Sequence, residues 1–239
     1  MSDGGEFEFI DRLRSRVPTG DEAVGIGDDA AVLADGTLAA VDTLVEGRHV
    51  RLDWATPEAI GWKALVVNLS DLAAMGGRPT AGLAAVTLPP TGADLADRLA
   101  TGLIEASTAF DCPLVGGDTT AGPTLVLSVT VLGRPDPEYG PVLRRGADVG
   151  DAVFVTGRIG AAAQAYTTLG AGGIPDERHA EALHRPVPRL AEGQVAAAAG
   201  ASAMIDVSDG LGADLGHLLD ASGVGVEIDG EAVPVADGV

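Results

Sequence analysis

The chain has 239 residues, enough for one large domain or two of ordinary size, and a formal net charge of −20 from 35 acidic and 15 basic residues. A negative field of this size repels nucleic acid and anionic lipid, so we expect neither as a partner. The single cysteine, Cys112, excludes an internal disulfide framework.

The N-terminal segment MSDGGEFEF lacks the basic start and apolar core of a signal peptide, and no apolar run reaches about 18 residues. We therefore expect a cytoplasmic protein without a membrane span. The acidic residues are spread along the chain rather than gathered in a tail, which favours a solvated surface and a salt-adapted protein. A thermal melt should then show greater stability in molar KCl than in dilute buffer.

In chain order, residues 5–17 have the pattern of a short amphipathic helix that Pro18 ends. An apolar run that starts at Pro57 predicts a long buried helix ending at Gly76 and Gly77. The elements predicted up to residue 133 are strands at 30–35, 37–42, 81–88, 113–118 and 123–133 and helices at 57–75 and 92–110.

A stretch rich in Pro and Gly, 134–141, predicts a domain boundary between about 134 and 150. We therefore divide the chain into domains 1–140 and 141–239. The elements predicted after the boundary are strands at 151–157, 202–206 and 224–229, helices at 159–170, 188–199 and 210–221, and a loop at 171–177. Strands and helices alternate throughout, which predicts an α/β or α+β fold.

Aspartates recur where an apolar segment meets Gly, Ser or Thr. They lie in IGDDAAVL (26–33), VDTLVEGRH (41–49), NLSD (68–71), GGDTT (116–120) and IDVSDG (205–210), and LRRGA (143–147) is a basic counterpart. Most of these residues have an ordinary interpretation. The ordinary interpretations are turns for Asp28, Asp29 and Asp118, a strand-end cap for Asp42, helix N-termini for Asp206 and Asp209, a solvated pair for Arg144 and Arg145, and a polar or core histidine for His49.

Asp71 is harder to explain, because it interrupts an apolar helix where neither a turn nor a cap is expected. A charge on such a face is costly unless it is paired or bound to metal. Scattered aspartates without a His or Cys cluster favour Mg²⁺ over Zn²⁺. The chain has no phosphate-binding G-x-x-x-x-G-K-[ST] loop, and its only lysine, Lys63, does not follow a Gly-rich loop. If it handles ATP, it uses another architecture.

The ordered blocks resemble the thiamine-monophosphate kinase family, within the superfamily of ATP-dependent aminoimidazole ribonucleotide synthetases, hydrogenase-maturation dehydratases and selenophosphate synthetases. The blocks are IGDDAAVL, VDTLVEGRH, KALVVNLSDLAAMG, LVGGDTT, RRGADVGD, VTGRIG, RPVPR and MIDVSDGL…DLGHL. They run across nearly the whole chain. Each block alone is weakly specific, whereas the ordered set is highly specific.

The resemblance implies a Mg²⁺-dependent kinase that transfers the γ-phosphoryl group of ATP directly to thiamine monophosphate, giving thiamine diphosphate and ADP without a phosphoenzyme. It also implies a two-domain aminoimidazole ribonucleotide synthetase-like fold, in which the N-terminal domain binds ATP and Mg²⁺ and pairs with its twin in a homodimer. Whether K⁺ is needed for turnover or only for folding stays open. The residues implied are Mg²⁺ ligands at Asp29, Asp42, Asp71, Asp118, Asp206 and Asp209, ATP contacts at Gly117, Asp118, Arg144 and Ser208, and a substrate contact at His49.

Two departures from the family pattern affect these expectations. The family usually has Ser or Thr just before the aspartate of the D-T-L block, where this chain has Ala40 and Val41, so one metal site differs. The family pattern also continues beyond Val239, so we expect a second domain that is C-terminally truncated relative to the family. Two alternatives therefore stay open: a non-catalytic module that binds Mg-ATP and dimerises, and a superfamily relative that acts on another acceptor.

Overall fold

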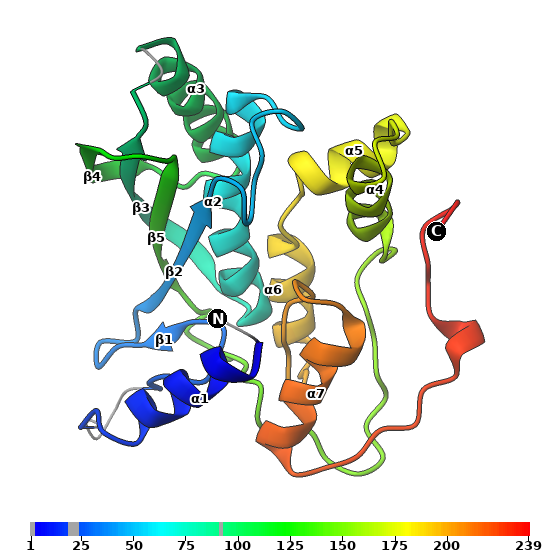
Figure 1. Ribbon diagram of the computed structural model, residues 1–239. Helices are drawn as coiled ribbons and strands as arrows, with labels where there is room; N and C mark the ends of the chain where they lie inside the picture. Colours follow the sequence, from blue (N-terminus) through cyan, green and yellow to red (C-terminus); the bar gives the residue numbers. More distant parts are fainter. Residues whose placement is uncertain (1–2, 19–23, 91–92) are drawn as a thin grey trace.

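The computed structural model describes residues 3–18, 24–90 and 93–239. In the N-terminal half five strands form one sheet, in the order β1-β2-β5-β3-β4 (Figure 1). The strands are β1 (Ala31–Val32), β2 (Leu38–Val45), β3 (Arg78–Leu88), β4 (Leu114–Ala121) and β5 (Val126–Arg134). The pair β3–β4 is parallel and the other pairs are antiparallel, so β4 is a parallel edge strand.

Two long helices, α2 (Pro57–Ala74) and α3 (Ala93–Ala109), cover one face of this sheet (Figure 1). The end of α1 (Asp3–Arg14) lies against the loop before β1, where a Cβ at Gly27 would meet the Arg14 guanidinium. Helix α2 starts where Thr56 Oγ1 accepts a hydrogen bond from Ala59 N. It packs closely on α3, because a Cβ at Gly102 would overlap the Glu58 carbonyl oxygen. The core between helices and sheet is fully buried and includes Leu65, Leu69, Leu72, Leu99, Leu127, Val129 and Val131.

The second half places four helices on the side of α2 away from the sheet (Figure 1). They are α4 (Ala161–Gly170), α5 (Glu177–His184), α6 (Leu190–Ala198) and α7 (Leu211–Ser222), and a short 3-10 helix, Gly230–Ala232, follows. Helix α6 lies directly on α2, where a Cβ at Gly193 would overlap the Ala73 carbonyl oxygen. Helix α2 therefore packs against both halves of the chain, against the sheet on one side and against α6 on the other.

The mixed α/β class and the strand and helix order up to residue 134 are confirmed, with bounds shifted by a few residues. Strand β1 is shorter than the predicted 30–35 because the chain turns back at Gly36, where Leu33 N donates to Thr37 O. The start of the helix predicted at 92–110 includes Gly92, which is outside the described residues. No described helix is long and apolar enough to cross a membrane.

The predictions of strands at 151–157, 202–206 and 224–229 are wrong. These segments have suitable apolar patterns, but in the described residues none of them is hydrogen-bonded into a sheet ladder. Phe154 is 89% exposed and Ile228 41% exposed, so these side chains do not pack as a strand face would. A strand needs a neighbour to satisfy its backbone groups, and a local pattern does not supply one. Helix α5 was not predicted; it begins after Asp176, whose side chain accepts from His179 N.

Candidate functional site

Three predicted aspartates meet where the two halves face each other. Asp29 lies in the loop before β1, Asp71 on α2 and Asp206 in the loop before α7. One carboxylate oxygen from each lies within 4.8 Å of the others. Segments far apart in the sequence thus converge on the partly exposed side of α2, which explains how this helix accommodates Asp71.

The three carboxyl groups strongly disfavour one another's charge. Burial, followed by the charges of Asp206, Asp42 and Asp29, raises the pKa of Asp71 to about 9. Burial and the charge of Asp29 raise the pKa of Asp206 to about 6. Burial also raises the pKa of Asp29, against the effect of Arg144. A divalent cation between these oxygens would offset the repulsion that raises the pKa of Asp71 and Asp206.

Arg144 is the only cationic side chain that a described ion pair joins to this cluster. Its Nη2 lies 2.6 Å from Asp29 Oδ1, and its backbone N–H donates to Asp28 at 3.2 Å. Arg144 Nε and Asp29 Oδ2 are both buried without a hydrogen-bond partner. An unpartnered buried donor and an unpartnered buried acceptor favour a site for an anion and a cation together.

The loop that carries Asp206, Ser208 and Asp209 is held by Asp214, a residue of α7 that is only 4% exposed. Asp214 Oδ2 accepts hydrogen bonds from the backbone N–H groups of Ser208, Asp209 and Gly210, at 3.0, 3.1 and 3.0 Å. One carboxylate oxygen therefore fixes three successive residues next to the aspartate cluster.

Asp42 lies near this cluster, since its charge acts on Asp71, and His49 lies near Asp42, but neither is one of the three clustered carboxylates. Asp42 shares a face of β2 with Leu38, Ala40 and Leu44, the face covered by α2. Loss of surrounding water raises the pKa of Asp42, the nearby His49 opposes this rise, and the charge of Asp209 adds to it. Val45 N donates to His49 Nδ1 at 3.1 Å, which leaves Nε2 as the ring nitrogen available to a ligand.

Asp118 lies on the opposite face of the sheet. Along β4 it pairs with Ala85, which pairs with Ser128 on β5, which pairs with Thr43 on β2. Residues in such a row point to one face, and Thr43 points away from the face of Asp42. The structure therefore does not bring Asp118 to the Asp29–Asp71–Asp206 cluster within one chain.

Gly117 belongs to the neighbouring row, on the helix-covered face. A Cβ there would overlap the Ala84 carbonyl oxygen, so a glycine is required for β4 to lie this close to β3. Its ATP contact stays a prediction.

Comparison with known proteins assigns the chain to a family. The sequence profiles of "AIR synthase related protein, N-terminal domain" and "AIR synthase related protein, C-terminal domain" match residues 27–134 and 148–239. The thiamine-monophosphate kinase of Mycobacterium tuberculosis (strain H37Rv) is 42% identical over 235 residues, 96% of this chain and 70% of that protein. The Salmonella typhimurium enzyme of the same name is 41% identical over 245 residues, 98% of this chain and 74% of that protein. The chain belongs to the thiamine-monophosphate kinase family.

Solved structures of the family have the same fold. "AaThiL complexed with AMPPCP and TMP" superposes with a TM-score of 0.86 at 32% identity and covers 98% of this chain and 75% of its own. Thiamine-monophosphate kinase from Stenotrophomonas maltophilia superposes with a TM-score of 0.80 at 38% identity, covering 97% and 77%. The two-domain aminoimidazole ribonucleotide synthetase-like fold expected from the motifs is thus confirmed.

Three residues that shape this site were not predicted from the sequence to be site residues. Ser70 Oγ donates to Asp206 Oδ2, Asp28 holds the backbone of Arg144, and Asp214 holds the loop before α7. All three stand inside the recognised sequence blocks, next to the residues chosen. The signal that could have found Asp214 is its place four residues after Gly210 at the start of a helix, where a carboxylate meets free N–H groups.

Proposed function

We propose that the chain is a Mg²⁺-dependent kinase that transfers the γ-phosphoryl group of ATP directly to thiamine monophosphate, giving thiamine diphosphate and ADP. Its family membership supports this activity, as does the printed description of a similar structure as a complex with AMPPCP and TMP. The observation that carries the proposal is the cluster of Asp29, Asp71 and Asp206 beside Arg144, where the two halves meet.

The residues present fit magnesium. Three carboxylates offer hard oxygen ligands, and Asp29 Oδ2 is buried without a partner. Mg²⁺ bound there would neutralise phosphate charge and hold the reacting oxygens in line. We also propose that Asp42, Asp209 and Asp118 extend the set of ligands, so that several ions bind. Ala40 and Val41 provide no side-chain oxygen at the Asp42 site, which leaves backbone carbonyls or water to complete it.

The remaining residues would bind and orient the substrates. Arg144 has an unpartnered Nε and would donate to phosphate oxygens of ATP. We propose that Gly117, Asp118 and Ser208 also contact ATP, Asp118 from the partner copy. His49 would present Nε2 to the acceptor. Ser70, the hydroxyl beside the cluster, donates to Asp206 at 2.8 Å and orients that carboxylate. We propose direct transfer to the acceptor without a phosphoenzyme.

A homodimer is part of the proposal. The sheet face away from α2 exposes Val41 (63%) and Leu83 (38%), which flank Thr130 in one row. Exposed apolar residues on a sheet face favour burial against another protein surface. Asp118 lies in the next row, so a second copy placed on this face would lie beside Asp118. We propose that Asp118 serves the site of the partner copy.

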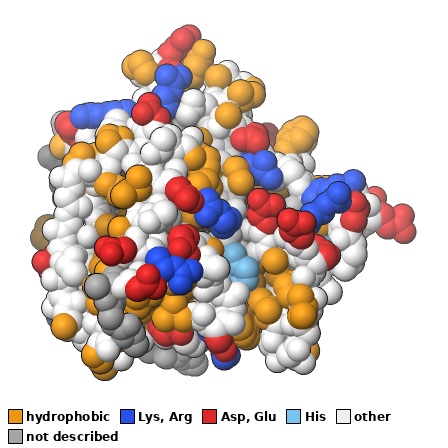
Figure 2. Space-filling model, turned by 90° about the horizontal axis from the view of Figure 1, so that it is seen from above, with side chains coloured by type: hydrophobic (Ala, Val, Ile, Leu, Met, Phe, Trp, Pro, Cys, Tyr) orange, Lys and Arg blue, Asp and Glu red, His pale blue; other side chains and the backbone are white. Residues whose placement is uncertain are grey.

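We further propose that domains 1–140 and 141–239 bind Mg-ATP between them, and that the protein works in the cytoplasm, where Mg-ATP is available. Its only cysteine, Cys112, is a buried free thiol. Figure 2 shows acidic and basic side chains side by side over the middle of one face, without a single-sign patch there. K⁺ would screen the excess of surface carboxylates, so the assay belongs in molar KCl.

The deciding experiment incubates the purified chain with Mg-ATP and thiamine monophosphate and follows thiamine diphosphate by chromatography. Formation of thiamine diphosphate supports the kinase. ATP hydrolysis that does not depend on thiamine monophosphate would instead indicate another acceptor. Binding of Mg-ATP by a folded chain with no turnover would indicate the non-catalytic module.

A further inference from the structure

Helices α4 and α5 form a pair that stands apart from the rest of the second half (Figure 1). In the described part of the chain the two helices pack extensively on each other, whereas α5 makes only a small contact with α2. The chain enters the pair through residues 151–160 and leaves it through residues 185–189, and neither segment contains a helix or a strand. The pair is therefore a separate body held by two irregular connections.

These two connections meet at the base of the pair. A Cβ at Gly157 would meet the Arg189 guanidinium, so the entering and the leaving segments are in contact there. Gly157 and Gly160 have φ angles of 74° and 95°, a backbone conformation that residues with a side chain rarely adopt. A body whose connections meet at one place can rotate about that place while its own helices stay intact.

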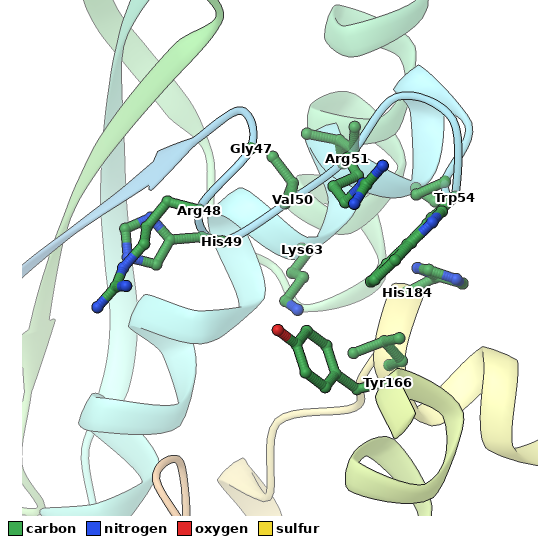
Figure 3. Close-up of a pocket in the computed structure, with 13 residues that line it drawn as sticks. Gly47, Arg48, His49, Val50, Arg51, Trp54, Lys63, Tyr166 and His184 are labelled. Carbon is green, nitrogen blue, oxygen red and sulfur yellow. The ribbon is translucent and has the colours of Figure 1, made fainter. Parts of the chain in front are cut away.

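The pair forms one wall of a cavity of about 110 Å³. Tyr166 of α4 and His184 of α5 lie on this wall, and Trp54 and Lys63 lie on the facing wall, which belongs to the first half. Figure 3 shows the Tyr166 hydroxyl pointing toward the Lys63 ammonium, with Trp54 near His184. Ligand sites commonly measure about 300–1,000 Å³. A cavity this small therefore admits only very small molecules until one of its walls moves.

Arg185, at the end of α5, fastens the pair to the first half. Its Nη2 lies 2.9 Å from Glu105 Oε2 of α3, and its guanidinium lies 4.2 Å from the centre of the Trp62 ring. Trp62 Nε1 also donates to the Pro186 carbonyl oxygen at 2.9 Å. The side chains of Arg185 and Glu105 are 35% and 47% exposed, and an ion pair in contact with water is weak. This fastening has a defined geometry and can still be released.

We propose that α4 and α5 form a lid over the cavity, that the lid rotates where Gly157 meets Arg189, and that Arg185 holds it shut. The structure is the closed form of this lid, and opening it enlarges the cavity enough for a ligand to enter or leave. The proposal concerns access to the cavity and does not depend on the kinase reaction, so it is tested without ATP or an acceptor.

Lys63 supplies the test, because it is the only lysine in the chain and lies behind the lid. Two reagents that modify amines are compared: cyanate, which is small, and trinitrobenzenesulfonate, which is too bulky for the closed cavity. Mass spectrometry of the Lys63 peptide gives each rate relative to the N-terminal amine of the same chain. Arg185→Met removes the ion pair and the contact with Trp62, so it should raise the rate with trinitrobenzenesulfonate about 5-fold or more. The rate with cyanate should stay unchanged.

Two further variants complete the test. Glu105→Gln removes the ion pair and keeps the contact between Arg185 and Trp62, so it should change the rate in the same direction but by less. Arg178→Met removes a positive charge from an exposed position of α5 and is the matched control, with both rates unchanged.

Equal acceleration with both reagents would mean that Arg185 changes the basicity of Lys63 rather than access to it, and would overturn the lid. An unchanged rate with trinitrobenzenesulfonate in Arg185→Met would overturn it as well. If Arg185→Met does not give the circular dichroism of the folded chain, the milder Glu105→Gln decides the same question with the same two reagents.

Discussion

Ser70 Oγ donates a 2.8 Å hydrogen bond to Asp206 Oδ2, and this bond joins α2 of the first half to the loop before α7 in the second. It places Asp206 against the neighbouring residue Asp71, whose carboxylate belongs to the same cluster. Two carboxyl groups held this close in a partly buried site need either protons or a cation. The relationship therefore makes Asp71 the most informative residue to change.

We predict that Asp71→Asn lowers the rate of thiamine diphosphate formation by about 1,000-fold or more, because it removes a charged ligand from the phosphoryl-transfer site. Asn has the same shape, so far-ultraviolet circular dichroism should be unchanged. The measurement is product formation under saturating Mg-ATP and thiamine monophosphate.

Asp97→Asn, at an exposed position of α3, is the matched control and should keep full activity. A normal rate for Asp71→Asn would remove Asp71 from the catalytic machinery and leave its place on α2 without a functional explanation.

The same substitution has a second consequence, for stability without metal. The pKa of Asp71 is about 9 in the folded chain, whereas its ordinary value is 3.8, so folding takes up a proton between these two pH values. The favourable contribution of protonated Asp71 to the free energy of unfolding is complete below about pH 4 and is lost as the pH rises toward 9. Asp71→Asn needs no such proton, so it should melt at a higher temperature than the original chain at pH 8.

The melts are run in EDTA at pH 5 and pH 8. The advantage of Asp71→Asn should be larger at pH 8 by at least about 3 °C, which corresponds to roughly 1 kcal/mol for a chain of this size. Added Mg²⁺ should stabilise the original chain more than the variant. An advantage that does not change with pH would mean that Asp71 is already ionised in the folded chain.

Changing Asp214 tests the geometry of the loop at residues 208–210, whereas changing Asp71 tests the charge of a metal ligand. Its Oδ2 accepts three backbone N–H groups from residues 208–210, so Asp214→Ala leaves these donors without their partner. We predict a 10- to 100-fold lower affinity for Mg²⁺, so that more Mg²⁺ is needed for the same rate. This is about the range expected when a group that orients metal ligands is removed. The measurement is the Mg²⁺ concentration for half-maximal rate.

Asp214→Asn keeps an acceptor oxygen for the three N–H groups, so it should bind Mg²⁺ more tightly than Asp214→Ala. This recovery would show that the hydrogen bonds to residues 208–210 matter, and not only the packing of the side chain. Asp220→Asn, further along α7, is the control. Equal Mg²⁺ dependence in Asp214→Ala and the original chain would show that the loop holds its shape without Asp214.

The sequence predicted those features that depend on local pattern. Asp71 stood out because a charge inside an apolar helix has no local explanation, and the structure brings it together with Asp29 and Asp206. The strands predicted at 151–157 and 224–229 failed because strand formation depends on neighbours that no local pattern specifies. Asp118 was grouped with the other aspartates because composition does not reveal which face of a sheet a residue occupies; the register of β3 and β4 decides that.

Asp118 leads to the last prediction, because it lies on the sheet face opposite to Asp42 and away from the cluster of its own chain. If Asp118 serves the site of a partner copy, each site takes Asp71 from one chain and Asp118 from the other. Asp71→Asn and Asp118→Asn then remove residues that different chains contribute to the site. Each variant alone should be inactive. A mixture of equal amounts, unfolded and refolded together, forms hybrid dimers in which one of the two sites has both aspartates. Half of the dimers are hybrids, so about a quarter of the original activity should return.

Light scattering on the same samples should show dimers. Dimers without recovered activity would mean that Asp118 acts within its own chain or not at all, and a monomeric chain would exclude the shared site.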